Sequence, residues 1–359
     1  MGPLQSLEAG HWFKLICGAS FQHLPSVRTL SLAYSLAGAD CIDVAADPGV
    51  IRMAREAITI ARTSASAPNQ SPWLMVSIND GEDPHFRKAL FNPKECPETC
   101  SQPCIPVCPA DAITPQSLLE TGVVEERCYG CGRCLTICPT QQIDAVSHQI
   151  DIHDLQSIFQ NYEVDALEIH TQVGHFENFK VVWQNLQPIL PQLKLLAISC
   201  PYESGVLNYL LNIQELITPL PCPLLWQTDG RPMSGDIGDG TTRTTVKYAQ
   251  QALESELEGF IQVAGGTNGH TVEKLKALGL LKNQKKEHDN LKSRSTVAGI
   301  AYGSYGRALF DTLQADLDQY TYGSQKIEEI PALLAEAIQL AESLVHPLKY
   351  HRVNHFQTH

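Results

Sequence analysis

The sequence lacks several features that would place it in common classes of protein. Its 359 residues include 26 lysines and arginines against 39 aspartates and glutamates, so the formal net charge is −13. Proteins that bind nucleic acid usually carry a basic surface, and this composition argues against one. No run approaches about 18 consecutive apolar residues, so no transmembrane helix is expected. The first residues contain no basic segment followed by an apolar one, and we therefore expect no export signal.

A dinucleotide fingerprint is also missing, because no G-x-G-x-x-G follows the first predicted strand. The chain does contain 12 cysteines, and eight of them fall between residues 96 and 138. Disulfide scaffolds are typically short secreted chains, whereas clustered thiols in a reducing compartment more often bind metal. These features predict a cytoplasmic protein whose clustered cysteines hold metal.

The most specific motif runs from Cys128 to Pro139 and reads C-x2-C-x2-C-x3-C-P. In this bacterial-type run, three cysteines bind one [4Fe–4S] cluster and the fourth ligates a second cluster. Gly130 and Gly132 let the backbone come close to the sulfides. A pair of zinc sites is the alternative, but zinc knuckles use two well-separated C-x2-C pairs. We therefore predict iron–sulfur binding here.

An upstream run with three residues in every gap also ends in Cys-Pro; its cysteines are Cys96, Cys100, Cys104 and Cys108. Its first two gaps are each one residue longer than usual, which leaves open whether its cluster is a full cubane. The two runs end alike, and together they resemble a two-cluster bacterial ferredoxin. That resemblance implies crossed ligation, with one [4Fe–4S] cluster on Cys128, Cys131, Cys134 and Cys108, and the other on Cys96, Cys100, Cys104 and Cys138.

Outside residues 86–147, short apolar runs alternate with helical patterns. The predicted strands span 13–20, 41–46, 73–80, 165–172, 194–200, 223–228, 259–265 and 296–302. The predicted helices span 26–38, 48–63, 151–162, 176–193, 206–217, 241–258, 271–281, 305–317 and 327–344, and the fourth is interrupted at Pro188 and Pro191. Eight β-α units favour a closed (β/α)8 barrel, for which about 250 residues are typical.

We assign residues 11–85 and 148–325 to the barrel-like domain and residues 86–147 to a ferredoxin-like α+β insert. Residues 326–359 are assigned to a C-terminal helix and a flexible tail. An open doubly wound sheet is the alternative to the barrel, since it also arises from alternating strands and helices.

Chemistry in such barrels gathers at the carboxyl ends of the strands, where we expect His170, Asp229 and Arg231 as candidate catalytic residues. The last two strands are followed by glycine-containing loops whose N–H groups suit a phosphate; the candidates are Gly265, Gly266, Asn268, Gly303 and Ser304. These loops resemble those of flavin-binding barrels such as the dihydroorotate dehydrogenase group, which implies FMN. Glycines that serve the turns alone are the alternative.

Five segments together resemble the light-dependent-period (LdpA) family of cyanobacteria, and they lie at residues 96–114, 128–139, 226–242, 261–272 and 298–310. The similarity extends from about residue 11 to residue 345. It implies a redox sensor that acts through protein partners and passes the cellular redox state to the circadian clock.

We expect a sensor rather than an enzyme, in which reduction of a cluster shifts the packing of the insert against the barrel mouth. The alternative is an oxidoreductase whose clusters relay electrons to a flavin or a substrate at that mouth. A third reading makes the clusters purely structural.

Overall fold

The computed structural model describes residues 2–64, 70–108, 110–114, 122–147, 152–230, 240–282, 296–321 and 326–349. Arg231, one of the expected catalytic residues, lies outside the described residues, as do residues 350–359 of the expected tail. None of the described helices combines the length and the apolar character needed to cross a membrane.

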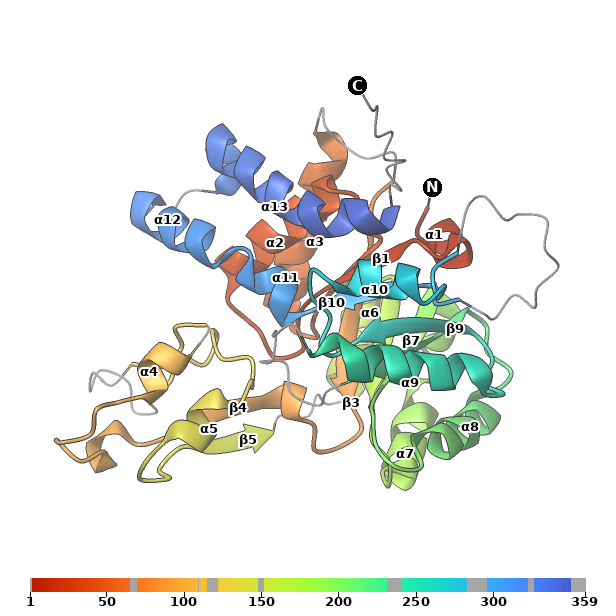
Figure 1. Ribbon diagram of the computed structural model, residues 1–359, viewed down its shortest axis with the longest axis horizontal. Helices are drawn as coiled ribbons and strands as arrows, with labels where there is room; N and C mark the ends of the chain where they lie inside the picture. Colours follow the sequence, from red (N-terminus) through yellow and green to blue (C-terminus); the bar gives the residue numbers. More distant parts are fainter. Residues whose placement is uncertain are drawn as a thin grey trace.

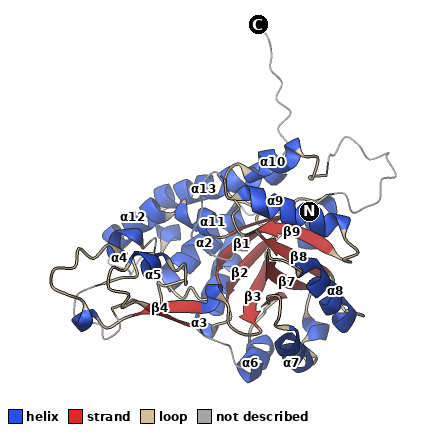
Figure 2. Cartoon of the chain, turned by 60° about the horizontal axis from the view of Figure 1, so that its bottom comes forward, coloured by secondary structure: helices blue, strands red, loops and turns tan. Residues whose placement is uncertain are grey.

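Eight parallel strands form a closed barrel in the order β1-β2-β3-β6-β7-β8-β9-β10, with β10 pairing back to β1 (Figure 1, Figure 2). The predicted barrel is confirmed and the open-sheet alternative is wrong. The strands are β1 (Trp12–Gly18), β2 (Cys41–Ala45), β3 (Trp73–Asn79), β6 (Ala166–His170), β7 (Leu195–Pro201), β8 (Leu224–Asp229), β9 (Phe260–Ala264) and β10 (Gly299–Tyr302).

Each barrel strand leads into a helical segment on the outside of the barrel, and α6 follows the insert. The segments are α2 (Leu24–Leu36), α3 (Pro48–Thr63), α6 (Ile152–Asn161), α7 (Phe176–Leu186), α8 (Val206–Ile217), α9 (Thr242–Glu254), α10 (Thr271–Ala277), α11 (Ser304–Ala308) and α12 (Asp311–Thr321). The start of α3 shows why such boundaries are readable. Asp47 caps it by accepting a hydrogen bond from Val50 N at 2.9 Å, and Pro48 occupies the first helical position.

Several helices differ in extent from the prediction, among them α9 and α10, which end at Glu254 and Ala277 instead of at residues 258 and 281. The stretch expected over 176–193 was predicted to be interrupted at Pro188 and Pro191. Helix α7 ends at Leu186, just before Pro188, and Leu190–Gln192 forms a 3-10 turn in place of further α-helix. The single helix expected over 305–317 is split into α11 and α12 by a tight turn in which Phe310 N donates to Arg307 O. The last helix, α13 (Pro331–Lys349), begins at its proline because a 3-10 turn precedes it.

Two helices outside the repeat cover parts of the barrel. Helix α1 (Pro3–Ala9) places Leu7 in an apolar cluster at the amino ends of the strands, with Trp12, Met75 and Leu195. Helix α13 packs against α2, and Lys349 Nζ lies 2.6 Å from Asp40 Oδ2. Helix α1 therefore lies at the amino end of the barrel, and the last residue of α13 is paired with Asp40 at the same end.

The segment between β3 and α6 forms a separate small α+β unit beside the barrel (Figure 1). Its strands β4 (Arg87–Leu90) and β5 (Asp144–Ser147) pair antiparallel, so that the first residue of β4 faces the last of β5. Two short helices, α4 (Cys104–Val107) and α5 (Arg133–Ile137), carry cysteines. Its own core contains Phe91, Ala112, Ile113, Val123 and Ile143. This arrangement is a ferredoxin-like α+β insert, as predicted.

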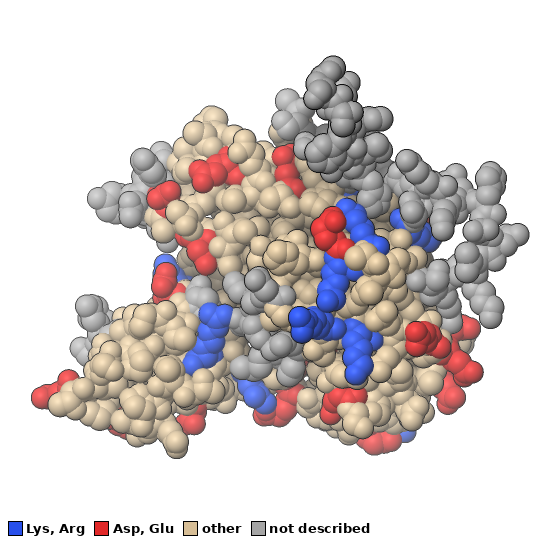
Figure 3. Space-filling model, in the orientation of Figure 1, with Lys and Arg blue, Asp and Glu red and all other residues tan. Residues whose placement is uncertain are grey.

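The surface drawn in Figure 3 carries acidic side chains on both the barrel and the insert, and basic side chains gathered over the region of α9 and α10. The outline is notched between the insert and the part of the molecule that carries α12 (Figure 3). The notch lies between the barrel domain and the insert.

Candidate iron–sulfur centres and the barrel mouth

Four cysteines from both motifs meet on one side of the insert. Cys108 of the first run lines one cavity together with the three leading cysteines of the second run, Cys128, Cys131 and Cys134. Burial, followed by the charges of Cys131, Cys128 and Cys108, raises the pKa of Cys134 to about 12. A protein without metal would therefore hold the Cys134 thiol protonated, and iron would supply the positive charge that a thiolate needs there.

The other four cysteines form a second group. Burial and the neighbouring charges of Cys100 and Cys138 raise the pKa of Cys96. Burial, and then Cys138, Cys96 and Cys100, raise the pKa of Cys104. All twelve cysteines are free thiols. Two groups of four thiols, each drawing one member from the other motif, fit a pair of iron–sulfur clusters.

Backbone N–H groups point at several of these sulfur atoms. Ala89 N donates to Cys128 Sγ and Ala112 N donates to Cys108 Sγ, each at 3.3 Å. Burial would raise the pKa of Cys138, but hydrogen bonds from the Thr140 side chain and nearby backbone N–H groups lower it. Hydrogen bonds to ligand sulfur stabilise negative charge and help to set a cluster's potential.

The loop that carries Cys128 and Cys131 also touches the barrel. The guanidinium of Arg307, on α11, lies 4.3 Å from the ring centroid of Tyr129, and Phe21 meets the same ring edge-on at 6.1 Å. Arg307 Nη1 donates to Ile16 O at 2.9 Å. The cation–π contact and this hydrogen bond together connect Tyr129, the neighbour of the candidate ligand Cys128, to strand β1.

Strand β4 provides a second connection. Lys88 is almost fully buried, and its Nζ donates to Gln22 Oε1 at 2.5 Å and to Glu125 O at 2.8 Å. Gln22 N donates to Glu126 O at 3.0 Å. The loop after β1 is therefore bonded to both sides of the insert.

A cleft of about 480 Å³ opens between the insert and helices α2, α11 and α12. Its walls include Cys108 and Tyr129 from the insert and Phe310 from the barrel. Two acids also line it, Asp111 from the insert and Asp311 from α12. Burial, with a further contribution from Asp111, raises the pKa of Asp311 to about 6. The two units therefore repel each other locally when both acids are ionised.

The barrel interior contains a buried ion network that the sequence did not predict. Lys14 is fully buried, its Nζ lies 3.0 Å from Asp43 Oδ2, and it also pairs with Glu168. Burial opposes the charge on Lys14, yet Asp43 and Glu168 raise its pKa. Burial also opposes the charge on Glu168, yet Lys14 and His170 lower its pKa to about 2. Lys14 and Glu168 are therefore ionised together, and Asp43, whose pKa is raised by burial, completes the network.

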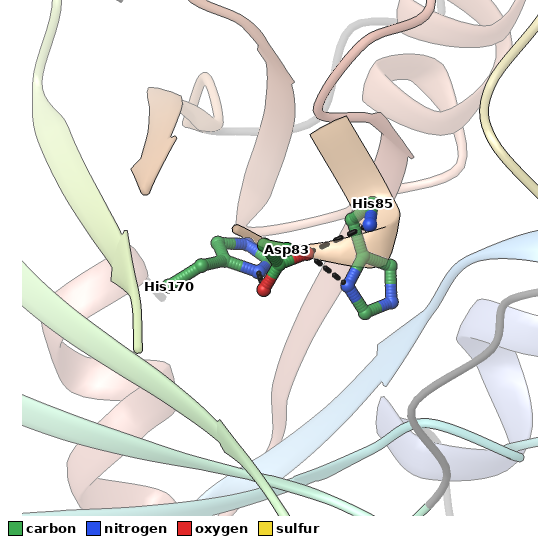
Figure 4. A group of neighbouring side chains, drawn as sticks. All are labelled: Asp83, His85 and His170. Atoms are coloured by element: carbon green, nitrogen blue, oxygen red, sulfur yellow. Dashed lines mark hydrogen bonds and ion pairs between the residues drawn. The ribbon is translucent and has the colours of Figure 1, made fainter. Parts of the chain in front are cut away.

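At the carboxyl end of β6, His170 joins this network to the entry of the insert (Figure 4). Its Nε2 lies 3.0 Å from Glu168 Oε1, and its Nδ1 lies 3.7 Å from Asp83 Oδ2. Asp83 Oδ1 lies 2.9 Å from His85 Nδ1. Burial opposes the charge on His170, but Asp83 and Glu168 raise its pKa well above the usual value.

The structure brings two of the three expected catalytic residues into one region. Asp229 is buried and accepts a hydrogen bond from Ser199 Oγ. Burial raises the pKa of Asp229, while the charges of His85 and His170 oppose that shift. Asp229 and His170 therefore face the same mouth.

The expected phosphate-binding residues lie in two separate loops. Gly265 O and Gly266 O accept hydrogen bonds from the hydroxyls of Thr245 and Thr241, at 2.5 Å and 2.8 Å. Asn268 Oδ1 accepts from His270 N at 3.0 Å. The other loop follows β10, where Gly303 precedes α11 and Ser304 Oγ accepts from Arg307 Nη2 at 3.1 Å. FMN binding stays a prediction.

Sequence reasoning missed several residues of the mouth and the junction: Lys14, Asp83, His85, Tyr129, Glu168 and Arg307. The sequence held a signal for three of them, Asp83, His85 and Glu168. Asp83 and His85 form an Asp-x-His pair just after the third predicted strand. The (β/α)8 prediction already placed that strand beside the one predicted over 165–172, which contains His170.

A (β/α)8 barrel with a ferredoxin-like, cysteine-rich insert defines an iron–sulfur protein of barrel type. The family model described as the LdpA Fe-S cluster-binding domain matches residues 96–149. The model described as the Light dependent period A C-terminal domain matches residues 158–347. Light dependent period A of Synechococcus elongatus is 49% identical over 347 residues, which cover 97% of this chain and 94% of the relative. The chain belongs to the LdpA family.

Other similarities are shorter or weaker. The polyferredoxin-like subunit of an aliphatic sulfonate oxidoreductase from Pyrococcus furiosus is 33% identical over 109 residues, covering 28% of this chain and 59% of that protein. A putative oxidoreductase of Escherichia coli, UacF, is 32% identical over 98 residues, covering 26% and 15%. The solved (S)-3-O-geranylgeranylglyceryl phosphate synthase of Thermoplasma acidophilum aligns over 96% of both chains with a TM-score of 0.41 and 12% identity.

Proposed function

We propose that this protein is a redox sensor that holds two [4Fe–4S] clusters in its insert, with the crossed ligation of two-cluster ferredoxins. The observation that carries this is the grouping of Cys108 with Cys128, Cys131 and Cys134 around one cavity. The electrostatic contact of Cys138 with Cys96 supports the reciprocal exchange. When bound, such clusters accept and release single electrons.

The chain's own groups adjust how readily that charge is accommodated. Ala89 N and Ala112 N donate to two ligand sulfurs of the group around Cys134, so added negative charge there is met by fixed dipoles. Arg307 is a buried cation against Tyr129, next to Cys128 in the sequence. The same guanidinium donates a hydrogen bond to Ile16 O, so a change of charge on the insert would alter a contact inside the barrel.

We further propose that this coupling is the output of the sensor, and that protein partners read the packing of the insert against the barrel. The 49% identity to Light dependent period A supports a role in the circadian clock of cyanobacteria. Free cysteines throughout support a cytoplasmic location, since such thiols persist in reducing compartments. The acidic composition argues against nucleic acid as the partner.

The decisive test is anaerobic purification with iron, acid-labile sulfide and flavin measured per chain, followed by a redox titration monitored by EPR. We expect about eight irons and no flavin. Cys134→Ser and Cys100→Ser should each remove one cluster and leave the other signal. Cys222→Ser is the matched control, because Cys222 is half-buried and far from both motifs in sequence. If either Cys134→Ser or Cys100→Ser abolished the EPR signals of both clusters while the protein stayed folded, two separate cluster sites would be contradicted.

The sensing step has its own test. Hydrogen exchange of the oxidised and the dithionite-reduced protein should differ at the contacts of Gln22, Tyr129 and Arg307. Identical exchange in both states, together with identical affinity for a clock partner, would remove the sensor proposal and leave a structural role for the clusters.

The cleft beside Cys108 favours one second candidate, an oxidoreductase whose clusters relay electrons to a flavin or a substrate. Its volume of about 480 Å³ falls within the range of small-molecule sites. Yellow absorption that persists after the clusters are bleached, with one flavin per chain, would support this alternative over the sensor.

A further inference from the structure

The group formed by Asp83, His85 and His170 has the composition of a metal site that is separate from the cysteines. Each residue offers one ligand atom, and these atoms lie within 4.8 Å of one another (Figure 4). Two imidazoles and one carboxylate are the ligand set of three-ligand zinc sites and of related iron(II) sites. The group is well sheltered, since Asp83 and His170 are buried and His85 is partly buried.

Two different parts of the fold supply these ligands. Asp83 and His85 lie in the short connection from β3 to β4, where Asp83 caps the 3-10 turn Pro84–Phe86 by accepting from His85 N at 2.7 Å. His170 is the last residue of β6, the strand that pairs with β3. The carboxyl ends of β3 and β6 are therefore adjacent, and the ligands meet where the insert leaves the barrel.

Glu168 orients His170 in the way that metal-binding histidines require. Its Oε1 lies 3.0 Å from His170 Nε2, so the ring is held by that nitrogen while Nδ1 faces Asp83. A carboxylate on the far nitrogen fixes the tautomer and raises the basicity of the ligating nitrogen. Phe86 packs against the same ring edge-on at 5.2 Å and provides an apolar wall.

The charges around the group favour an added cation. Five buried carboxylates lie at the centre and mouth of the barrel: Asp43, Asp80, Asp83, Glu168 and Asp229. Lys14 is the buried lysine that pairs with Asp43 and Glu168. Besides Lys14, the imidazoles of His85, His170 and His175 lie against these acids. His175 Nδ1, for example, lies 3.0 Å from Asp80 Oδ1. A divalent ion between Asp83, His85 and His170 would be a positive partner for Asp83, as Lys14 is for Asp43 and Glu168.

We propose that Asp83, His85 and His170 bind a divalent transition-metal ion of the zinc class at the junction of barrel and insert. Three protein ligands leave one position for water or a small ligand. The ion would also fasten the entry of the insert to strand β6. This site goes beyond the proposed redox function, because it uses none of the clustered cysteines.

The test uses full-length protein with its clusters loaded, so that the cysteine sites are filled, and zinc alone as the probe. After gel filtration, elemental analysis should find one zinc per chain besides the cluster iron. Zinc K-edge absorption should show a nitrogen and oxygen shell near 2.0–2.1 Å and no sulfur shell at about 2.3 Å. A sulfur shell would place the zinc on cysteine and overturn the proposal.

Variants locate the ion. His85→Gln and Asp83→Asn should each weaken zinc binding at least 100-fold and abolish the rise in melting temperature that zinc gives the parent protein. His175→Gln is the matched control, since it removes a histidine that pairs with Asp80 on the same rim but is not in the group. His85→Gln is the safer variant, because His85 is the most exposed member.

Unchanged iron and sulfide content in these variants would keep this result distinct from failure of the cluster assignment. Zinc affinity that is equal in the parent, His85→Gln and Asp83→Asn would refute the site. Absence of zinc binding in the parent would also refute it and would identify the group as a closed network of histidines and carboxylates.

Discussion

Arg307→Ala should loosen the insert from the barrel, and the structure separates the two parts of the effect. The contact of the guanidinium with the Tyr129 ring, at 4.3 Å, joins the two units. The hydrogen bond to Ile16 O, at 2.9 Å, lies within the barrel. A partly buried cation–π contact contributes roughly 1–2 kcal/mol. Loss of the charged hydrogen bond costs the barrel roughly another 1.5–3 kcal/mol.

Only the first contribution acts on the cluster loop. We therefore expect the free energy for opening the loop around Tyr129 to fall by about 1–2 kcal/mol, which corresponds to roughly 5- to 30-fold faster amide exchange. The assay is anaerobic hydrogen exchange with mass spectrometry on the cluster-loaded protein. Tyr129→Leu should reproduce the effect on the loop.

Tyr129→Phe keeps the ring but removes the hydroxyl that is hydrogen-bonded to Arg307, so its effect on exchange should be smaller than that of Tyr129→Leu. The reasoning would be refuted if Arg307→Ala accelerated exchange around Ile16 alone, or if Tyr129→Leu left the loop protected. Either result would mean that Arg307 serves the barrel and does not couple it to the insert.

Three further predictions test the insert, the barrel interior and the cleft. Gly130→Ala should lower the iron content, because an added methyl would lie 2.3 Å from a backbone oxygen, whereas Gly38→Ala, also at positive φ, meets nothing within 4 Å and should keep its iron. Lys14→Met leaves buried carboxylates without their cation and should cost about 3–5 kcal/mol, seen as a melting temperature lowered by roughly 6–20 °C; an unchanged melting temperature would contradict the ion network. Asp311→Asn should stabilise the protein by up to about 1 kcal/mol at pH 8, because it removes a half-buried charge and, with it, the repulsion from Asp111. The folded pKa of Asp311, about 6, lies above its ordinary value, so the folded parent protein loses stability as the pH rises through that range and the carboxyl ionises. Urea unfolding should therefore show a smaller stabilisation by Asp311→Asn at pH 5 than at pH 8.

The barrel was predictable because each of its strands is a short apolar run that is followed by a helical pattern. Strand β2, for example, is buried at all five positions. Its sequence, CIDVA, is mostly apolar and predicts a buried strand despite the aspartate. The pairing of β4 with β5 was not predictable in this way. Three of the four residues of β5 are exposed and the partner strands lie more than fifty residues apart, so no local pattern marks them.

The cysteines and the residues of the barrel mouth differ in how they can be found. The spacing of the cysteines predicts the kind of site directly, because three of the expected ligands belong to one short loop. The group of Asp83, His85 and His170 is assembled from the ends of two strands. The sequence around His170 therefore does not indicate which residues lie beside it. The missing step was to apply the predicted topology to the loops: once strands 73–80 and 165–172 are neighbours in a parallel barrel, Asp83 and His85 must lie beside His170. Glu168 follows from the same step, since it lies two residues before His170 on one strand and therefore points to the same side of the sheet.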